Sequence, residues 1–253
     1  MLKSFKIRKW PVLAMVIMAL SLAMGAPAHG QEALLQQGNA AYATGRYAEA
    51  AERFAGELKR APSAEAWRNL GNAEWQRGQR AEAVLAWERA RWLNPADGEV
   101  AASLRFARNT AQLTVPPLRW WEVFSSSLSP NAWAGLAAGS FWGALLAAVI
   151  LPAAWRRWRS AWSQSLAAFG LGLFLLALTG AYGVQTRARL GVILPQSASL
   201  LQAPAAHAPV VFKLNGGDVV RTAQRRGAYY HVVCASGEGG WLEHSQFTNI
   251  VGR

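Results

Sequence analysis

The sequence predicts a multidomain membrane protein in three parts: α-helical repeat hairpins, a two-helix transmembrane hairpin and a small all-β barrel. Three observations predict this fold class. A pattern of small and aromatic residues recurs after 33 residues, which is typical of a helical repeat. Two uncharged apolar runs follow it, each long enough to cross a bilayer. Short β-prone runs separated by turn residues fill the rest of the chain.

Residues 1–30 have the three-part layout of a secretory signal peptide. A basic start over residues 3–9 precedes an apolar run over residues 12–24, and small residues around Ala26 and Ala28 complete a cleavage site. The apolar run is short for a membrane span, although an uncleaved anchor is the alternative. In both cases the next segment is expected on the outer side of the membrane.

Residues 31–113 are predicted to form two helical hairpins, 31–63 and 64–97, followed by a capping helix. The repeat pairs five positions at one offset: Gly38, Gly45, Ala50, Phe54 and Pro62 recur as Gly71, Gly78, Ala83, Trp87 and Pro95. The glycines allow close packing and tight turns, and the prolines end helices. Repeats of this kind bind proteins far more often than they carry out chemistry.

The second copy resembles the tetratricopeptide repeat (TPR) pattern. The matching residues are Trp67, Leu70, Gly71, Ala83, Trp87, Ala90 and Pro95. The first copy departs from the pattern, with Leu34 at the expected tryptophan and a spacing one residue short. The resemblance implies that the first helix of each unit lines a concave groove for a partner protein. The groove residues by repeat position are Asn39, Tyr42, Arg68, Asn72 and Trp75, and an ordinary solvated face is the alternative interpretation.

Residues 114–131 are predicted to be a Trp-rich linker, because Pro116-Pro117 and the serines near residue 127 disfavour helix. The aromatic stretch over residues 118–124 between them indicates a short segment at the lipid headgroup level. A short helix packed on the repeats is the alternative.

Two transmembrane helices are predicted over residues 132–151 and 166–184, with a cytoplasmic loop over residues 152–165 between them. Neither run holds an Asp, Glu, Lys, Arg or His residue, so the pair is expected to anchor the chain and not to conduct ions. Arg156, Arg157 and Arg159 place the loop in the cytoplasm by the positive-inside rule, although Arg187 and Arg189 run against it. The repeats and the C-terminal domain are therefore expected in the periplasm of a multi-pass inner-membrane protein.

Residues 189–253 change to short β-prone runs and resemble a bacterial SH3 domain. The matching runs are residues 217–220, 229–232 and 239–242, of which Gly-Gly-Trp-Leu is the most specific. The resemblance implies a small SH3-like barrel. Its aromatic residues Tyr229, Tyr230 and Trp241 cannot all be core, so they are the predicted groove for an extended peptide or glycan.

The search for catalytic chemistry finds none. The sequence has no phosphate-binding loop, its four histidines never lie at metal-ligand spacing, and Cys234 is the single cysteine. We therefore expect no enzyme activity, no cofactor and no metal site. Residues 31–118 are nearly neutral, with eleven basic and ten acidic residues, so the net charge of +12 comes from elsewhere. Basic residues flank the apolar runs, and the C-terminal part adds Lys213, Arg221, Arg225, Arg226 and Arg253. A nucleic-acid partner is not expected.

The order of these segments is similar to that of the Bacteroides aerotolerance protein E (BatE) family, over essentially the whole chain. The resemblance also rests on Leu104-Arg105-Phe106-Ala107 in the capping helix and on Trp120-Trp121 before the first span. It implies a membrane-anchored scaffold beside a MoxR-type AAA+ ATPase and von Willebrand factor A-domain membrane proteins, in envelope stress tolerance. The alternative function is a peptidoglycan-associated module that recruits a cell-wall enzyme.

Overall fold

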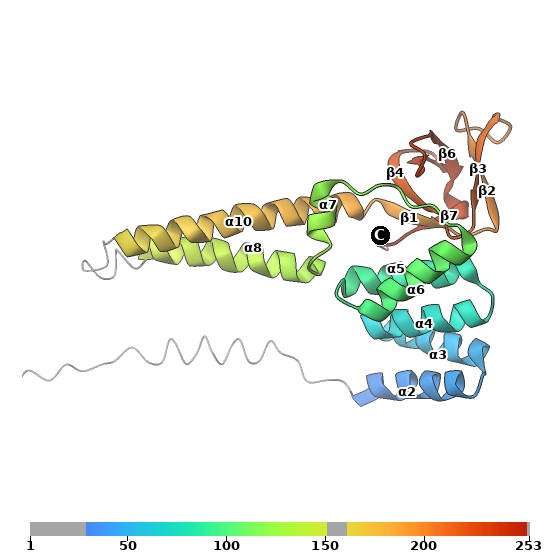
Figure 1. Ribbon diagram of the computed structural model, residues 1–253, viewed down its shortest axis with the longest axis horizontal. Helices are drawn as coiled ribbons and strands as arrows, with labels where there is room; N and C mark the ends of the chain where they lie inside the picture. The colour runs from blue at the N-terminus through green and yellow to red at the C-terminus, as the bar shows by residue number, and fades with distance from the viewer. Residues whose placement is uncertain (1–28, 151–160, 252–253) are drawn as a thin grey trace, which may run out of the picture.

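The computed structural model describes residues 29–150 and 161–251. Nearly all of the predicted signal peptide and most of the predicted cytoplasmic loop lie outside these residues. The described chain forms a stack of helices, a long apolar helical hairpin and an antiparallel sheet (Figure 1). The stack and the sheet both lie at the end of the hairpin where its first helix begins, at residue 130, and its second helix ends, at residue 187 (Figure 1).

The helical stack contains five helices, each packed on the next along the chain. Gly45 and Gly78 make the turns within the two hairpins with positive φ angles of 77° and 79°, which favour glycine. The helices are α2 (His29–Ala43), α3 (Tyr47–Arg60), α4 (Ala64–Gln76), α5 (Arg80–Leu93) and α6 (Gly98–Ala111).

The 33-residue periodicity has a packing cause. A Cβ atom on Gly38 would lie 2.5 Å from the Phe54 ring, and one on Gly71 would lie 2.5 Å from the Trp87 ring. In each hairpin an aromatic ring of the second helix therefore lies directly on the backbone of the first. The rings of Phe54 and Trp87 are almost completely buried there, so glycine and aromatic ring form one repeated contact.

Two helices form the apolar hairpin. Helix α8 (Pro130–Leu145) continues into the π-helical turn η1 (Leu146–Ile150), and α10 (Ala161–Arg187) returns antiparallel to it. Both are long and apolar enough to cross a membrane, as the sequence predicts. Only 17% of the most apolar window of each is buried inside the protein. Large side chains such as Phe141, Trp142 and Phe169 are exposed, which favours membrane association over a soluble core.

The strands form one open sheet in the order β3-β2-β6-β5-β4-β1-β7, and all neighbours run antiparallel. Strands β3 and β7 are the two free edges. The seven strands are β1 (Leu190–Ile193), β2 (Ser197–Leu201), β3 (Val210–Asn215), β4 (Val219–Arg226), β5 (Tyr229–Val233), β6 (Gly239–Glu243) and β7 (Phe247–Asn249).

The predicted small SH3-like barrel is therefore wrong. The physical reason lies in β1, which is buried along its whole length. Leu190 and Val192 belong to a core shared with α5 and α6, whereas Ile193 belongs to the core on the other face of the sheet. Because helices cover one face, the sheet buries both faces near β1 without closing on itself.

The predicted layout of separate TPR, transmembrane and SH3-like modules is wrong for the same reason. The helical stack and the sheet share one apolar core, in which Val84 and Leu104 meet Val192, Val219 and Ile250. Arg89 of α5 donates hydrogen bonds to the backbone carbonyls at the end of β7, at 3.1 and 3.3 Å. The stack and the sheet consequently form one continuous body.

The segment between the stack and the hairpin is ordered against the sheet. The carboxylate of Asp218 accepts hydrogen bonds from the backbone and the hydroxyl of Thr114 at 2.7 and 2.9 Å. The backbone N–H of Val219 donates to the carbonyl of Thr114 at 3.0 Å. The next residues form the short helix α7 (Trp120–Ser125), which packs mainly on α10.

Helix α7 places a carboxylate at the junction of all three parts. Glu122 is completely buried and accepts two hydrogen bonds from the Arg221 guanidinium on β4. Arg187, at the end of α10, donates to the Ser125 hydroxyl at 3.2 Å, and its guanidinium lies over the Trp92 ring of α5 at 5.1 Å. Burial alone would raise the pKa of Glu122, but hydrogen bonds from Arg221 and from the Arg119 backbone outweigh it and hold that pKa below its usual range.

The glycine–aromatic contact gives a matched pair of variants. We expect Gly71→Ala to destabilise the full-length protein by about 1–2 kcal/mol, because the added methyl group overlaps the Trp87 ring and overpacking outweighs better helix propensity. Gly56→Ala is the control, since its Cβ would lie 3.8 Å from Leu34 in ordinary contact. Thermal melts in detergent, followed by circular dichroism, should show a lower Tm for the first variant only.

The buried carboxylate predicts a pH-dependent stability. At neutral pH, Glu122→Gln should cost about 2–3 kcal/mol, because Arg221 keeps its charge without its carboxylate partner. A lowered pKa in the folded state means that this stabilisation is complete above the unfolded pKa of about 4.3 and is lost as pH falls through the folded pKa. The Tm difference between the two proteins should therefore shrink below about pH 4. A constant difference over this range would contradict a charged Glu122.

Candidate functional site

One face of the helical stack brings together four of the five residues predicted from repeat position. Asn39, Tyr42, Asn72 and Trp75 line two adjoining cavities of about 110 and 150 Å³, which share Tyr42 and Asn72. Helix α6 closes the larger cavity with residues that sequence reasoning missed, above all Phe106. The Phe106 side chain is 56% exposed. The signal available in the sequence was an aromatic residue outside the i, i+4, i+7 row that Val100, Leu104 and Ala107 form on this helix.

Side-chain amides supply most of the polar groups of this face, and Tyr42 and Ser103 add hydroxyl groups. Asn72 accepts a hydrogen bond from the Trp87 indole at 3.0 Å through Oδ1, and no described residue accepts from its Nδ2. Asn69, a second residue missed by sequence reasoning, donates to Oδ1 of Asn39 at 3.1 Å. The Asn72 amide is thus held in place by one atom and presents its N–H donors to the cavity.

Aromatic rings form the apolar part of the same face. The centroid of the Trp75 ring lies 5.6 Å from that of Trp87 and 5.6 Å from that of Phe106. The Tyr42 ring packs edge-on against Tyr47 at 5.2 Å. Each ring is therefore held by a neighbour and presents a fixed edge, so a ligand side chain would meet a preformed surface.

Arg68, the fifth predicted residue, lies outside both cavities. Its guanidinium lies 3.1 Å from the Asp97 carboxylate and 3.4 Å from that of Glu99. Asp97 also caps α6 by accepting hydrogen bonds from the backbone N–H groups of Glu99 and Val100. The arginine thus holds the capped end of α6, and its charge is already balanced by carboxylates within the protein.

The three aromatic residues predicted for a groove on the C-terminal domain lie on opposite faces of the sheet. Tyr230 pairs with Leu242 and packs on Phe247, so it lies on the core face. Tyr229 and Trp241 lie on the other face, where Trp241 packs edge-on against His231 at 5.3 Å. The three side chains therefore do not form one binding groove.

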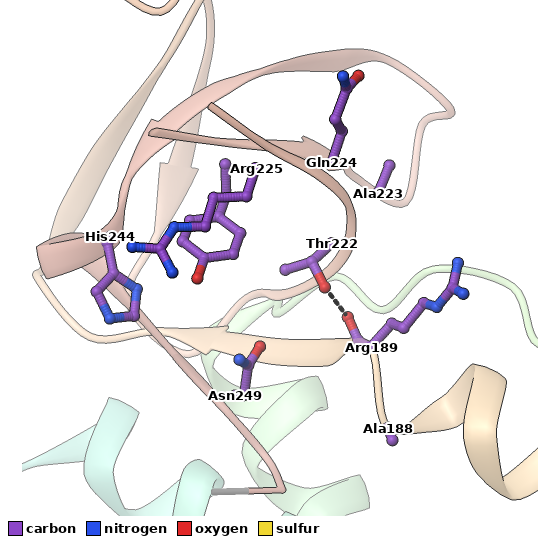
Figure 2. A pocket seen from close by; sticks show the side chains of 9 residues that line it. Ala188, Arg189, Thr222, Ala223, Gln224, Arg225, His244 and Asn249 are labelled. Carbon is purple, nitrogen blue, oxygen red and sulfur yellow. Dashed lines mark hydrogen bonds between the residues drawn. The ribbon is translucent and has the colours of Figure 1, made fainter. Parts of the chain in front are cut away.

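A larger cavity of about 550 Å³ lies where the chain leaves α10 and enters the sheet. Figure 2 shows Arg225, His244, Thr222 and Asn249 around its opening, whereas Gln224 points away. Thr222 donates to the carbonyl of Arg189 at 2.8 Å, which joins β4 to the residues just after α10 (Figure 2). Sequence reasoning did not find this cavity, because its residues come from five separate segments.

The described residues hold few groups suited to catalysis. No group of three His, Cys, Asp or Glu side chains within residues 29–150 and 161–251 could hold a metal ion. Cys234 is buried, with its sulfur 3.1 Å from the Ser236 hydroxyl and 3.1 Å from the carbonyl of Glu238. The arrangements on the stack face and at the cavity are suited to binding.

Compared with models of protein families and with curated proteins, the chain shows no significant match to either.

Proposed function

We propose that the chain is a membrane-anchored scaffold that holds partner proteins beside the membrane through the stack face. The observation that carries this proposal is the combination of fixed aromatic edges with an unpaired amide donor at Asn72, in the two adjoining cavities. Amide donors suit backbone carbonyls of an extended peptide, and aromatic edges suit its side chains. The ligand is therefore a short extended segment of another protein.

The resemblance to the BatE family supplies the identity of the proposed partners. These are von Willebrand factor A-domain membrane proteins and a MoxR-type AAA+ ATPase, in an envelope stress-tolerance complex. The apolar hairpin supports a role at the membrane, because its exposed side chains need lipid. A partner held in the same membrane meets the stack face at a raised effective concentration, so a small contact suffices.

Capture of these partners should depend on two residues of the face. Trp75→Ala should weaken it about tenfold or more, because the half-buried aromatic ring that lines the larger cavity is lost. Asn72→Asp keeps the acceptor for the Trp87 indole and replaces the amide donors by a carboxylate oxygen, so it should weaken capture while the hydrogen bond to Trp87 is kept. The measurement is crosslinking of the tagged full-length protein in membranes, with recovered proteins quantified by mass spectrometry.

Asn109→Asp is the matched control, since Asn109 is exposed on α6 outside both cavities. It carries the same change of charge and should leave capture unchanged. Equal recovery of A-domain proteins with Asn72→Asp and with Asn109→Asp would show that the stack face does not bind them. Recovery of cell-wall enzymes in place of A-domain proteins would show that the proposed partners are wrong.

We further propose that the stack and the sheet are periplasmic, on the basis of the basic loop around Arg157. Cysteine labelling tests this side assignment. The native Cys234 is 3% exposed, so it gives little background. Ala102→Cys, at an exposed position on α6, should react with a membrane-impermeant maleimide in intact spheroplasts, whereas Arg157→Cys should react only after permeabilisation. The reverse pattern would place the stack in the cytoplasm.

A further inference from the structure

The cavity at the C-terminal end of α10 is lined by basic side chains and by no acidic ones. Its nine described lining residues include Arg189, Arg225 and His244 and no acidic residue. The volume of about 550 Å³ is sufficient for a small charged group with its substituents. A cavity of this composition favours an anion over a neutral or cationic ligand.

A β-bulge places the central cation of this cavity. The pairing of β4 with β5 shifts between Thr222 and Gln224, so Ala223 is the extra residue on β4. Because of this shift, Arg225 lies opposite Tyr230, and its guanidinium lies 5.5 Å from the centre of that ring. Without the bulge the register would place Arg225 opposite Tyr229, on the other face of the sheet.

The donors of Arg225 are oriented toward the cavity and lack a partner within the described chain. Its Nε donates to the carbonyl of Gly227 at 3.2 Å, which fixes the plane of the guanidinium. No described residue accepts from its two terminal nitrogens, and Figure 2 shows them directed toward His244. Two parallel N–H donors of this kind match the oxygens of a phosphate group.

The floor of the cavity offers a hydrogen-bond acceptor in place of donors. Oδ1 of Asn249 is buried and accepts no hydrogen bond from any described residue. A buried acceptor without a donor is costly, so a ligand hydroxyl at this point would be stabilising. The cavity thus offers the Arg225 N–H groups as donors to a phosphate and Asn249 Oδ1 as an acceptor for a hydroxyl. A ligand that matches both is a phosphate with a hydroxylated substituent.

The position of the cavity indicates where such a ligand comes from. One wall consists of Ala188 and Arg189, the first two residues after α10. Figure 1 shows β4 at the side of the sheet nearest to the α8–α10 hairpin, with β2 and β3 at the far side. If α10 crosses the bilayer, the cavity lies at the level of the lipid headgroups.

We propose that this cavity binds the phosphate headgroup of an anionic, hydroxylated lipid such as phosphatidylglycerol. Arg225 holds the phosphate oxygens, Asn249 accepts from a glycerol hydroxyl, and Arg189 adds charge at the rim. Binding of this kind would hold the sheet on the membrane surface, next to the point where the chain leaves the membrane after α10. The same phosphate chemistry also occurs in soluble ions, and the experiment distinguishes the two sources.

The test is native mass spectrometry of the full-length protein in detergent, with phosphatidylglycerol or phosphatidylcholine added at equal concentration. The wild type should retain phosphatidylglycerol preferentially, and Arg225→Gln should reduce the retained fraction about fivefold. Asn249→Asp should reduce it as well, because a negative charge in the cavity repels the anionic headgroup. Arg226→Gln is the matched control, since Arg226 pairs with Tyr229 and faces away from the cavity.

A second arm adds inorganic phosphate or glycerol 3-phosphate at millimolar concentration. Retention of phosphatidylglycerol that survives this competition supports the lipid as the ligand. Equal retention by Arg225→Gln and Arg226→Gln would overturn the site. Arg225-dependent binding of free phosphate, without preference for phosphatidylglycerol over phosphatidylcholine, would overturn the lipid assignment.

Discussion

The buried ion pair between Glu122 and Arg221 is the constraint on which the arrangement of this protein depends. It joins the helix before the apolar hairpin to β4, and Arg187 at the end of α10 completes the junction through Ser125 and Trp92. Buried charges are tolerated only with their partners in place. A displacement of α10 by one turn would separate these groups, so the junction fixes the stack and the sheet relative to the apolar hairpin.

The sequence predicted local structure better than the arrangement of the strands. Glycine turns, prolines and apolar periodicity are local signals, and the helices and strands lie close to the ranges those signals indicated. Closure of a sheet depends on contacts between distant segments. The run Leu190–Ile193 nevertheless held a usable signal, because a continuous apolar strand is typical of burial on both faces. That signal favours a sheet covered by helices over a small barrel.

The same distinction explains the outcome at the predicted sites. Asn72 and Trp75 share a face with Tyr42 because repeat position determines which side of a helix faces the cavities. Arg68 lies one turn before Asn72, but Asp97 from a later helix pairs with it, and no repeat pattern shows such a pairing. The separation of Tyr229 from Tyr230 was predictable, because neighbours on a strand point to opposite faces.

The dimensions of the stack face determine what kind of binding it can support. Cavities of about 110 and 150 Å³ accept one side chain each, which is far less than a stable soluble interface buries. Such a contact alone gives weak affinity, because the loss of translational freedom consumes most of the interaction energy. In the proposed scaffold, confinement of both proteins to one membrane would reduce that loss. The rigid junction between the stack face and the apolar helices would reduce it further, since the orientation of the face is then already set.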